Sequence, residues 1–184
     1  MELTRRDAVA ALGAVGAAGA VGVARLVDEP PAATPSEDSS REDLPSNAAV
    51  GNALVAAARV VYPDAVSGIE EFVETFLSGR LDREEHAAGM RRAVADLDDR
   101  ATTWYEDQFA ALDPADRDSL LREVGADAAD EDPDGTTAER VRYYVVNELL
   151  LALYASPTGG ELVGIENPQG HPGGQTSYQR GPQA

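Results

Sequence analysis

The sequence contains no cysteine and no lysine, few aromatic residues and only two histidines. Without cysteine the chain has no disulfide, no thiolate nucleophile, no cysteine-bound iron–sulfur cluster and no CxxCH haem attachment site. His86 and His171 alone are too few for a histidine-rich metal site. An aromatic content of 5%, beside an apolar content of 43% weighted toward alanine, valine and leucine, favours closely packed helices over a β-sandwich.

Negative charge dominates the chain, with 33 acidic residues against 15 basic ones and a net charge of -18. Because the carboxylates are spread along the body rather than gathered in one block, we interpret them as adaptation to a salt-rich host, a haloarchaeon. A specific cationic partner is the alternative interpretation. The absence of a basic stripe that could neutralise phosphates excludes nucleic-acid binding.

The N-terminus has the pattern of an export signal. Arg5 and Arg6 precede an uncharged run rich in alanine and glycine over 8–24. Paired arginines ahead of such a run resemble a twin-arginine signal, and the run is too short and glycine-rich to be a stable membrane span. We assign residues 1–27 to a twin-arginine signal or an N-terminal membrane anchor; an amphipathic helix that happens to contain the arginine pair is the alternative. Residues 28–45, rich in proline, serine and acid, are predicted to be a linker.

Helix start and stop signals place a helical domain over 46–155. Ser46 is predicted to cap a helix over 47–61. Residues 67–70 have capping-box form and predict a second helix that ends at Gly79. Residues 82–85 repeat that form and open the longest helix, which we expect to run to about residue 111.

Two further helices complete the predicted domain. Asp113 and a following proline start a short helix that Gly125 closes. Residues 136–139 cap a last helix that ends near Tyr154. Since no hairpin signal occurs, the sequence predicts an all-α fold, a small irregular bundle of about five helices with an extended glycine- and proline-rich tail over 156–184.

The end of the chain is its most distinctive part. The last helix, VRYYVVNELLLALY over 141–154, is apolar nearly all round and must be covered on every side. The continuation YASPTGGELVGIENPQGHPGG keeps apolar residues among glycines, a pattern typical of a segment that lies extended in a groove. This arrangement resembles the C-terminal half of the gluconate 2-dehydrogenase subunit 3 family, and the likeness extends over about 48–174.

The resemblance implies a non-catalytic accessory subunit of an exported, flavin-dependent gluconate, sugar or alcohol dehydrogenase. Its partner would be a large subunit of the glucose–methanol–choline type that holds FAD, with an electron-transfer subunit as a second candidate. The small chain would support export and stability of that flavoprotein, either secreted or on the extracellular face of the membrane, held there by its N-terminus. The residues expected to contact the partner are Leu149, Leu153, Tyr154, Leu162, Ile165, His171, Gly173 and Gly174.

Two functions of other classes stay open. One is a stand-alone, membrane-tethered helical protein with a binding or structural role. The other is a small secreted enzyme that uses acidic clusters or His171 on its glycine–proline turn. The clusters are Glu70, Glu71 and Glu74, and Asp96, Asp98 and Asp99; in so acidic a chain we interpret both as solvated surface. We predict no catalytic, cofactor-binding or metal-binding residue in this chain, and no helix has the Glu-x-x-His pattern of a di-iron bundle.

Two further side chains have two interpretations each. Trp104 continues the predicted buried stripe of the longest helix, so we expect it in the core rather than on the floor of a ligand pocket. Glu148 lies in the apolar last helix, where we expect it to pair with an arginine such as Arg142 or Arg59. Contact with the partner protein is the alternative for Glu148.

Overall fold

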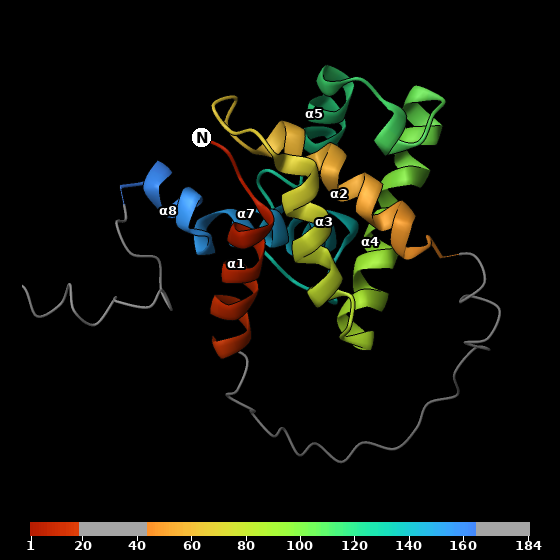
Figure 1. Cartoon of the computed structure of the whole chain (residues 1–184). Helices are drawn as coiled ribbons and strands as arrows, with labels where there is room; N and C mark the ends of the chain where they lie inside the picture. The colour runs from red at the N-terminus through yellow and green to blue at the C-terminus, as the bar shows by residue number, and fades with distance from the viewer. Residues whose placement is uncertain (19–43, 165–184) are drawn as a thin grey trace, which may run out of the picture.

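Helices make up nearly all regular structure in the computed structural model, which describes residues 1–18 and 44–164 (Figure 1). The α-helices are α1 Arg5–Ala18, α2 Asn47–Val61, α3 Ile69–Arg80, α4 Glu84–Tyr105, α5 Pro114–Glu123, α6 Thr137–Val141, α7 Glu148–Ala155 and α8 Pro157–Leu162. A 3-10 turn, Phe109–Ala111, precedes α5, and a π-helical segment, Arg142–Asn147, joins α6 to α7. The β-type pairing within the described ranges is one parallel bridge between Glu2 and Ser67, so the predicted all-α class is confirmed.

The helices begin where the sequence predicts them when a side chain supplies the cap. Ser46 accepts a hydrogen bond from the Ala49 N–H at 3.2 Å, and Asp113 accepts from the N–H groups of Ala115 and Asp116. The hydroxyl of Thr136 and the carboxylate of Glu139 form a complete capping box at the start of α6. These contacts satisfy N–H groups that the first turn of a helix leaves without partners.

The capping box predicted at 67–70 is wrong. The cap of α3 is Gly68, in the left-handed region with φ +73°, and it makes no side-chain hydrogen bond. A Cβ on Gly68 would lie 2.1 Å from the carbonyl oxygen of Leu3, so this position needs glycine because a distant part of the chain lies against it.

The start and end of the longest helix also differ from the prediction. Asp82 does not cap α4, whose cap residue is Arg83 and carries no side-chain hydrogen bond. The helix ends at Tyr105, six residues before the predicted limit, because Glu106 adopts φ +63°. The 3-10 turn at Phe109–Ala111 then places Phe109 in the core, with its N–H donating to Asp98 at 3.0 Å.

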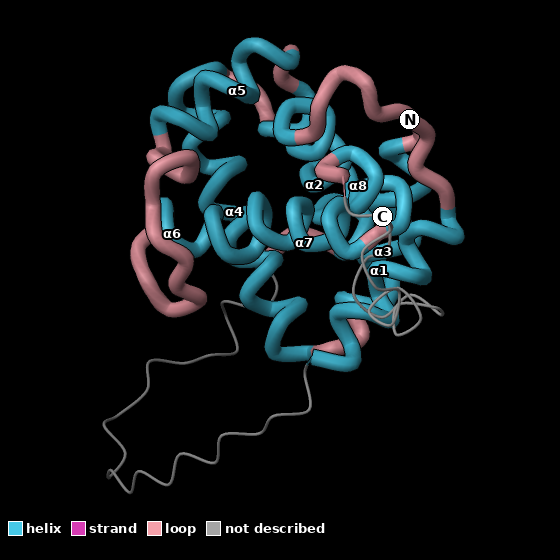
Figure 2. Tube along the Cα trace, turned by 90° about the vertical axis from the view of Figure 1, so that its left-hand side faces the viewer, coloured by secondary structure: helices cyan, strands magenta, loops and turns pink. Residues whose placement is uncertain are grey.

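The core lies between α2, α3, α4 and the segment from α6 to α7. Figure 2 shows α7 in the middle of the molecule, with α1, α3 and α8 on one side of it. The largest fully buried side chains are Phe72, Phe76, Phe109, Leu3, Leu54, Met90, Leu97, Leu120, Leu149, Leu153, Val50 and Val73. The predicted buried stripe of α4 is therefore confirmed at Met90 and Leu97.

The N-terminal helix α1 belongs to this core. It packs mainly against α3 and α7 and also touches α8, and Leu3, Ala8 and Ala11 are buried. The core thus extends beyond the expected domain limits of 46–155. Residues 5–18 form a helix, and their role in export stays a prediction.

The sequence predicted an extended tail directly after α7, but another helix follows α7 instead. Ser156 is fully buried and caps α8, accepting a hydrogen bond from the N–H of Gly159 at 3.0 Å. Residues 157–162 are therefore helical rather than extended. The rest of the predicted tail, 165–184, and the predicted linker through residue 43 lie outside the described residues.

Candidate partner interface

A charged network lies inside the protein between three helices. Arg80, at the end of α3, donates from Nε to Glu148 Oε2 at 2.7 Å, and its Nη2 bonds to the other carboxylate oxygen. His86, near the start of α4, places Nε2 3.1 Å from Glu148 Oε1. Both Arg80 and Glu148 are buried, so the pair ties α3 to the first turn of α7.

Glu148 is thus paired with an arginine as expected, but Arg142 and Arg59 were the wrong candidates. Arg59 pairs with Glu70 at 2.9 Å on the surface, and Arg142 donates to the Ala126 carbonyl. Arg80 could have been found from the sequence, because it lies on the same helical face as the buried Val73 and Phe76. Its position at the end of α3 is also favourable for a cation.

The electrostatics of this network keep Glu148 ionised. Burial by itself would raise the pKa of Glu148, but the hydrogen bonds from His86 and Arg80, with the positive charge of Arg80, lower it below its ordinary value. Every group in the network has a protein partner, and the rings of Tyr143 and Tyr144 lie against His86. We therefore assign the network a structural role.

The acidic clusters do not form a metal site in the part of the chain that the structure describes. Among those residues no group of three or more histidine, aspartate or glutamate side chains converges. The carboxylates have individual partners instead: Glu70 with Arg59, Glu71 with Arg5, Asp96 with Arg140, and Asp98 with the Phe109 N–H.

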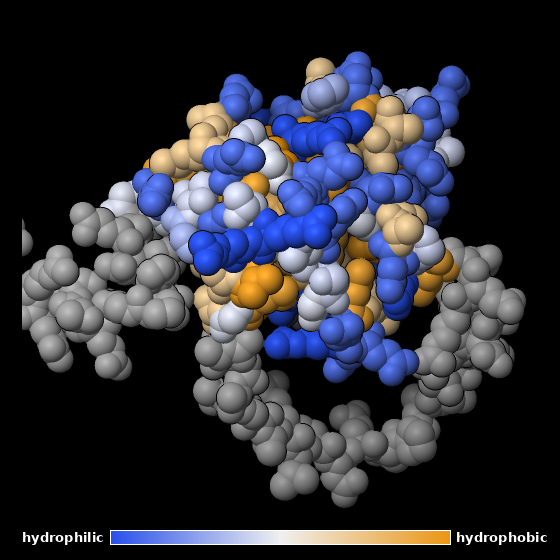
Figure 3. Space-filling view, viewed as in Figure 1, coloured by the Kyte–Doolittle hydropathy of each residue, from blue (hydrophilic) through white to orange (hydrophobic). Residues whose placement is uncertain are grey.

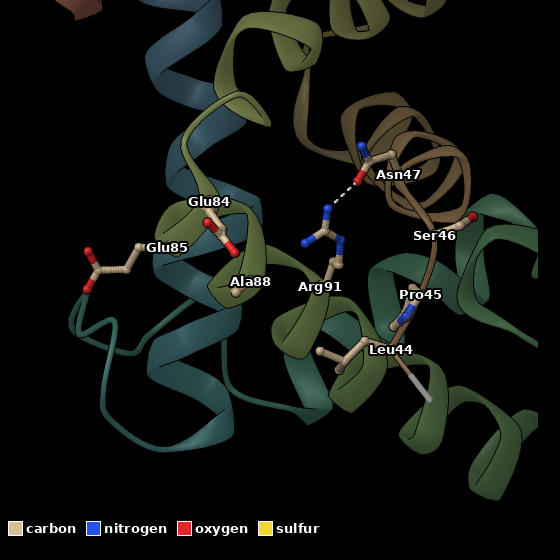
Figure 4. A pocket seen from close by; sticks show the side chains of 8 residues that line it. All are labelled: Leu44, Pro45, Ser46, Asn47, Glu84, Glu85, Ala88 and Arg91. Carbon is tan, nitrogen blue, oxygen red and sulfur yellow. Dashed lines mark hydrogen bonds between the residues drawn. The ribbon is translucent and has the colours of Figure 1, made fainter. Parts of the chain in front are cut away.

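A surface depression lies where the N-termini of α2 and α4 meet (Figure 4). Its lining residues are Leu44, Pro45, Ser46, Asn47, Glu84, Glu85, Ala88 and Arg91. Arg91 points toward Asn47 and donates to its Oδ1 at 2.6 Å, while Glu85 points away from it. Arg91 is bonded to Asn47, and the carboxylates of Glu84 and Glu85 are exposed to solvent. The residues that line the depression are therefore not a set suited to acid–base or nucleophilic chemistry.

Large apolar side chains are exposed on the terminal helices. Val9 of α1, Leu151 and Tyr154 of α7, and Val163 after α8 are 62, 43, 48 and 51% exposed. These elements pack against one another, since α1 contacts α7 and α8. Figure 3 shows a mostly hydrophilic face in which small apolar areas interrupt the polar surface, one of them over α1.

Trp104 is not in the core, contrary to the prediction. It is 44% exposed and lies beside Arg100, whose guanidinium carbon is 5.6 Å from the ring centroid. The buried stripe stops at Ala101, and the helix ends at Tyr105, one turn later.

The predicted partner-contact residues fall into three groups. Leu149 and Leu153 are each 1% exposed and contribute to the core of this chain. Tyr154 is exposed and Leu162 is partly buried, so both remain accessible at the surface predicted to contact a partner. Ile165, His171, Gly173 and Gly174 lie outside the described residues. Leu151 and Val163 have the exposure suited to the same surface, although the sequence analysis did not select them.

These observations define an all-α protein whose described part carries apolar side chains at its surface and no metal-ligand cluster. A model of the gluconate 2-dehydrogenase subunit 3 family matches residues 48–173. The chain therefore belongs to that family, which makes it an accessory subunit of a dehydrogenase complex that associates with other dehydrogenase subunits. No curated protein and no solved structure matches the chain significantly. Within the described ranges, no helix combines the length and apolar character that crossing a bilayer requires.

Proposed function

We propose that this chain is the small subunit of an exported flavin-dependent dehydrogenase that oxidises gluconate, another sugar or an alcohol. Its partner is a large subunit of the glucose–methanol–choline type carrying FAD, and the small chain supports the stability and export of that flavoprotein. The family match over 48–173 carries the proposal. The exposed apolar side chains of Leu151, Tyr154 and Val163 support a contact near the end of α7 and beyond α8.

The export part of the proposal is supported by the arginine pair. Arg5 and Arg6 are exposed on the first turn of α1, ahead of the alanine-rich run. A twin-arginine route would deliver the complex to the extracellular face of the membrane or to the medium, in a host whose salt screens the acidic surface. A stand-alone binding protein remains the competing function, and isolation of the chain from its native host separates the two.

The association is tested by recovering a tagged chain from the native host in molar salt. The native chain should bring with it a yellow protein with flavin absorbance. The double variant Leu151→Glu and Tyr154→Glu should reduce flavin recovery at least tenfold, because it places charge in an apolar contact. A chain that stops after Gly164 retains every described helix and tests the contribution of 165–184.

Trp104→Glu is the matched control, since it also places a carboxylate on an exposed apolar residue but on another helix. Its flavin recovery should equal that of the native chain. Recovery of no flavoprotein by the native chain would refute the proposed complex. Equal recovery by the native chain and the double variant would refute the assigned surface alone.

A further inference from the structure

Several apolar residues of the segment that would act as the export signal are part of the protein's own core. Leu3 is 1% exposed, and Ala8 and Ala11 are fully buried against the rest of the domain. Leu12 and Val15 are partly buried and pack on the same core. The N-terminal segment, residues 1–18, therefore places several of its apolar side chains inside the fold, while Met1 and Val9 stay exposed.

The surface that receives this segment is shaped for it at two glycines. A Cβ on Gly68 would lie 2.1 Å from the Leu3 carbonyl oxygen, and one on Gly79 would lie 2.9 Å from the methyl groups of Leu12. Main-chain hydrogen bonds fix the first contact, because the Leu3 N–H donates to Ser67 O at 2.8 Å. A larger residue at Gly68 would overlap the backbone of the segment and exclude it from its observed position, whereas at Gly79 the overlap is with the end of the Leu12 side chain alone.

The segment is also joined to the other end of the domain. The carboxylate of Asp7 accepts hydrogen bonds from the hydroxyl and N–H of Thr158, at 2.8 and 3.2 Å. It accepts two more from the hydroxyl and N–H of Thr4, at 2.6 and 2.9 Å. Burial alone would raise the pKa of Asp7, but these four hydrogen bonds lower it, so the carboxylate is ionised where it meets α8.

We propose that the folded domain is the receptor for its own N-terminal segment, and that docking and export are mutually exclusive uses of that segment. The inference rests on the proposed export function. Because Leu3, Ala8 and Ala11 face the core, they are inaccessible to a transport receptor or to lipid until the segment leaves its seat on α3, α7 and α8. The contact between Asp7 and Thr158 sets how often the segment leaves its seat. Thr158 lies on α8, the helix that precedes the exposed Val163 of the proposed partner contact.

A protease that cleaves after arginine and tolerates molar salt measures undocking directly. Cleavage at Arg5 and Arg6 of the purified full chain, followed by mass spectrometry, requires that the helix opens locally. Thr158→Val removes the hydroxyl but keeps the side-chain shape, and it should raise the cleavage rate at this pair about tenfold, as expected for losing one hydrogen bond to a charged group. Thr158→Ser retains the hydroxyl and should be cleaved like the native chain. Equal rates for native and valine chains would overturn the inference.

A cross-link supplies a second measurement that does not depend on Thr158. A Cβ at position 79 lies 3.4 Å from Leu12 Cγ, so Leu12→Cys with Gly79→Cys places two thiols within disulfide reach, in a chain that has no other cysteine. The oxidised chain should be cleaved at the arginine pair at least tenfold more slowly than the reduced chain. Equal cleavage of the two forms would show that the segment is already undocked and would overturn the inference.

Export in the native host separates this inference from the proposed function. Pulse-labelled Thr158→Val should reach the outside of the cell faster than the native chain, and Thr158→Ser at the native rate. Arg5→Lys with Arg6→Lys should retain the chain inside. If the lysine variant is exported normally, the proposed export function fails; if it is retained while the valine chain leaves at the native rate, only the docking control fails.

Discussion

Arg80 and Glu148, which are 68 residues apart in the sequence, form a buried ion pair that joins two helices, with Nε donating to Oε2 at 2.7 Å. The pair lies between α3 and α7, and His86 of α4 contacts the same carboxylate. Its geometry places two hydrogen bonds from one guanidinium on one carboxylate, the arrangement that gives an arginine–carboxylate pair both strength and direction. The three helices are therefore fixed relative to one another by charge as well as by apolar packing.

Arg80→Ala should lower the free energy of unfolding by about 3–5 kcal/mol, because it leaves a buried carboxylate without its main partner. Denaturant unfolding in molar salt measures the change. Arg59→Ala, which breaks the exposed pair with Glu70, is the control and should cost less than about 1 kcal/mol. The double variant Arg80→Met with Glu148→Leu should recover most of the loss, and a double variant as unstable as Arg80→Ala would contradict this account.

Glu148 should make the protein less stable in acid. Its folded pKa lies below its ordinary value of 4.5, so the stabilisation from ionisation is complete above that pH and is lost as pH falls toward the lowered value. Unfolding free energies measured from pH 6 down to pH 3 should therefore decrease more steeply for the native chain than for Glu148→Gln. Identical pH slopes for the two chains would show that the carboxylate does not gain protons on unfolding in this range.

Gly89→Ala should destabilise the protein although alanine is the better helix former. A Cβ at this position would lie 2.2 Å from the ring of Tyr144, which is buried, and relieving that overlap should cost about 1–3 kcal/mol. Gly51 in α2 is the matched control, since its added Cβ would meet nothing within 4 Å. Gly51→Ala should raise the free energy of unfolding by about 0.5–1 kcal/mol. Thermal or denaturant unfolding of both variants shows whether the signs differ as expected.

Tyr62→Phe tests a buried polar contact at the junction of α2 and α7. The Tyr62 hydroxyl donates to the Leu149 carbonyl oxygen at 2.8 Å, and burial raises the pKa of Tyr62 well above its ordinary value, so the donor stays protonated. Removing the hydroxyl should cost about 1–2 kcal/mol of unfolding free energy, because a buried acceptor loses a hydrogen bond. Tyr105→Phe, whose hydroxyl contacts Glu123 near the surface, should have a smaller effect. An equal loss in the two variants would contradict the role of burial.

The features that could be predicted from the sequence are those in which cause and effect lie close together. Three helix caps join residues no more than three positions apart, so the local sequence pattern was sufficient to predict them. They are formed by Ser46, Asp113 and Thr136. The apolar stripe of α4 likewise follows from helical periodicity. The family resemblance over about 48–174 was carried by the pattern at the chain end, and the family match over 48–173 confirms it.

The features that could not be predicted depend on contacts between distant segments. The cap of α3 is Gly68 rather than the capping box predicted at 67–70, because Leu3 lies against Gly68. The residues around position 68 give no signal of this contact. Leu149 and Leu153 were expected at a partner surface, but α1 is among the elements that cover α7 within the same chain. Trp104 fits the helical period yet remains exposed, because periodicity predicts which face is apolar but not where the neighbouring helices end.

The link between Asp7 and Thr158 closes a loop of 151 residues, and this has a consequence for the order of events during synthesis. The surface that receives the first residues to leave the ribosome is not complete until α7 and α8, among the last, have also emerged. For most of translation the nascent N-terminus therefore lacks part of the surface that holds it in the finished protein. The time needed to make the remaining chain sets how long a factor can reach the nascent N-terminus before its docking is complete.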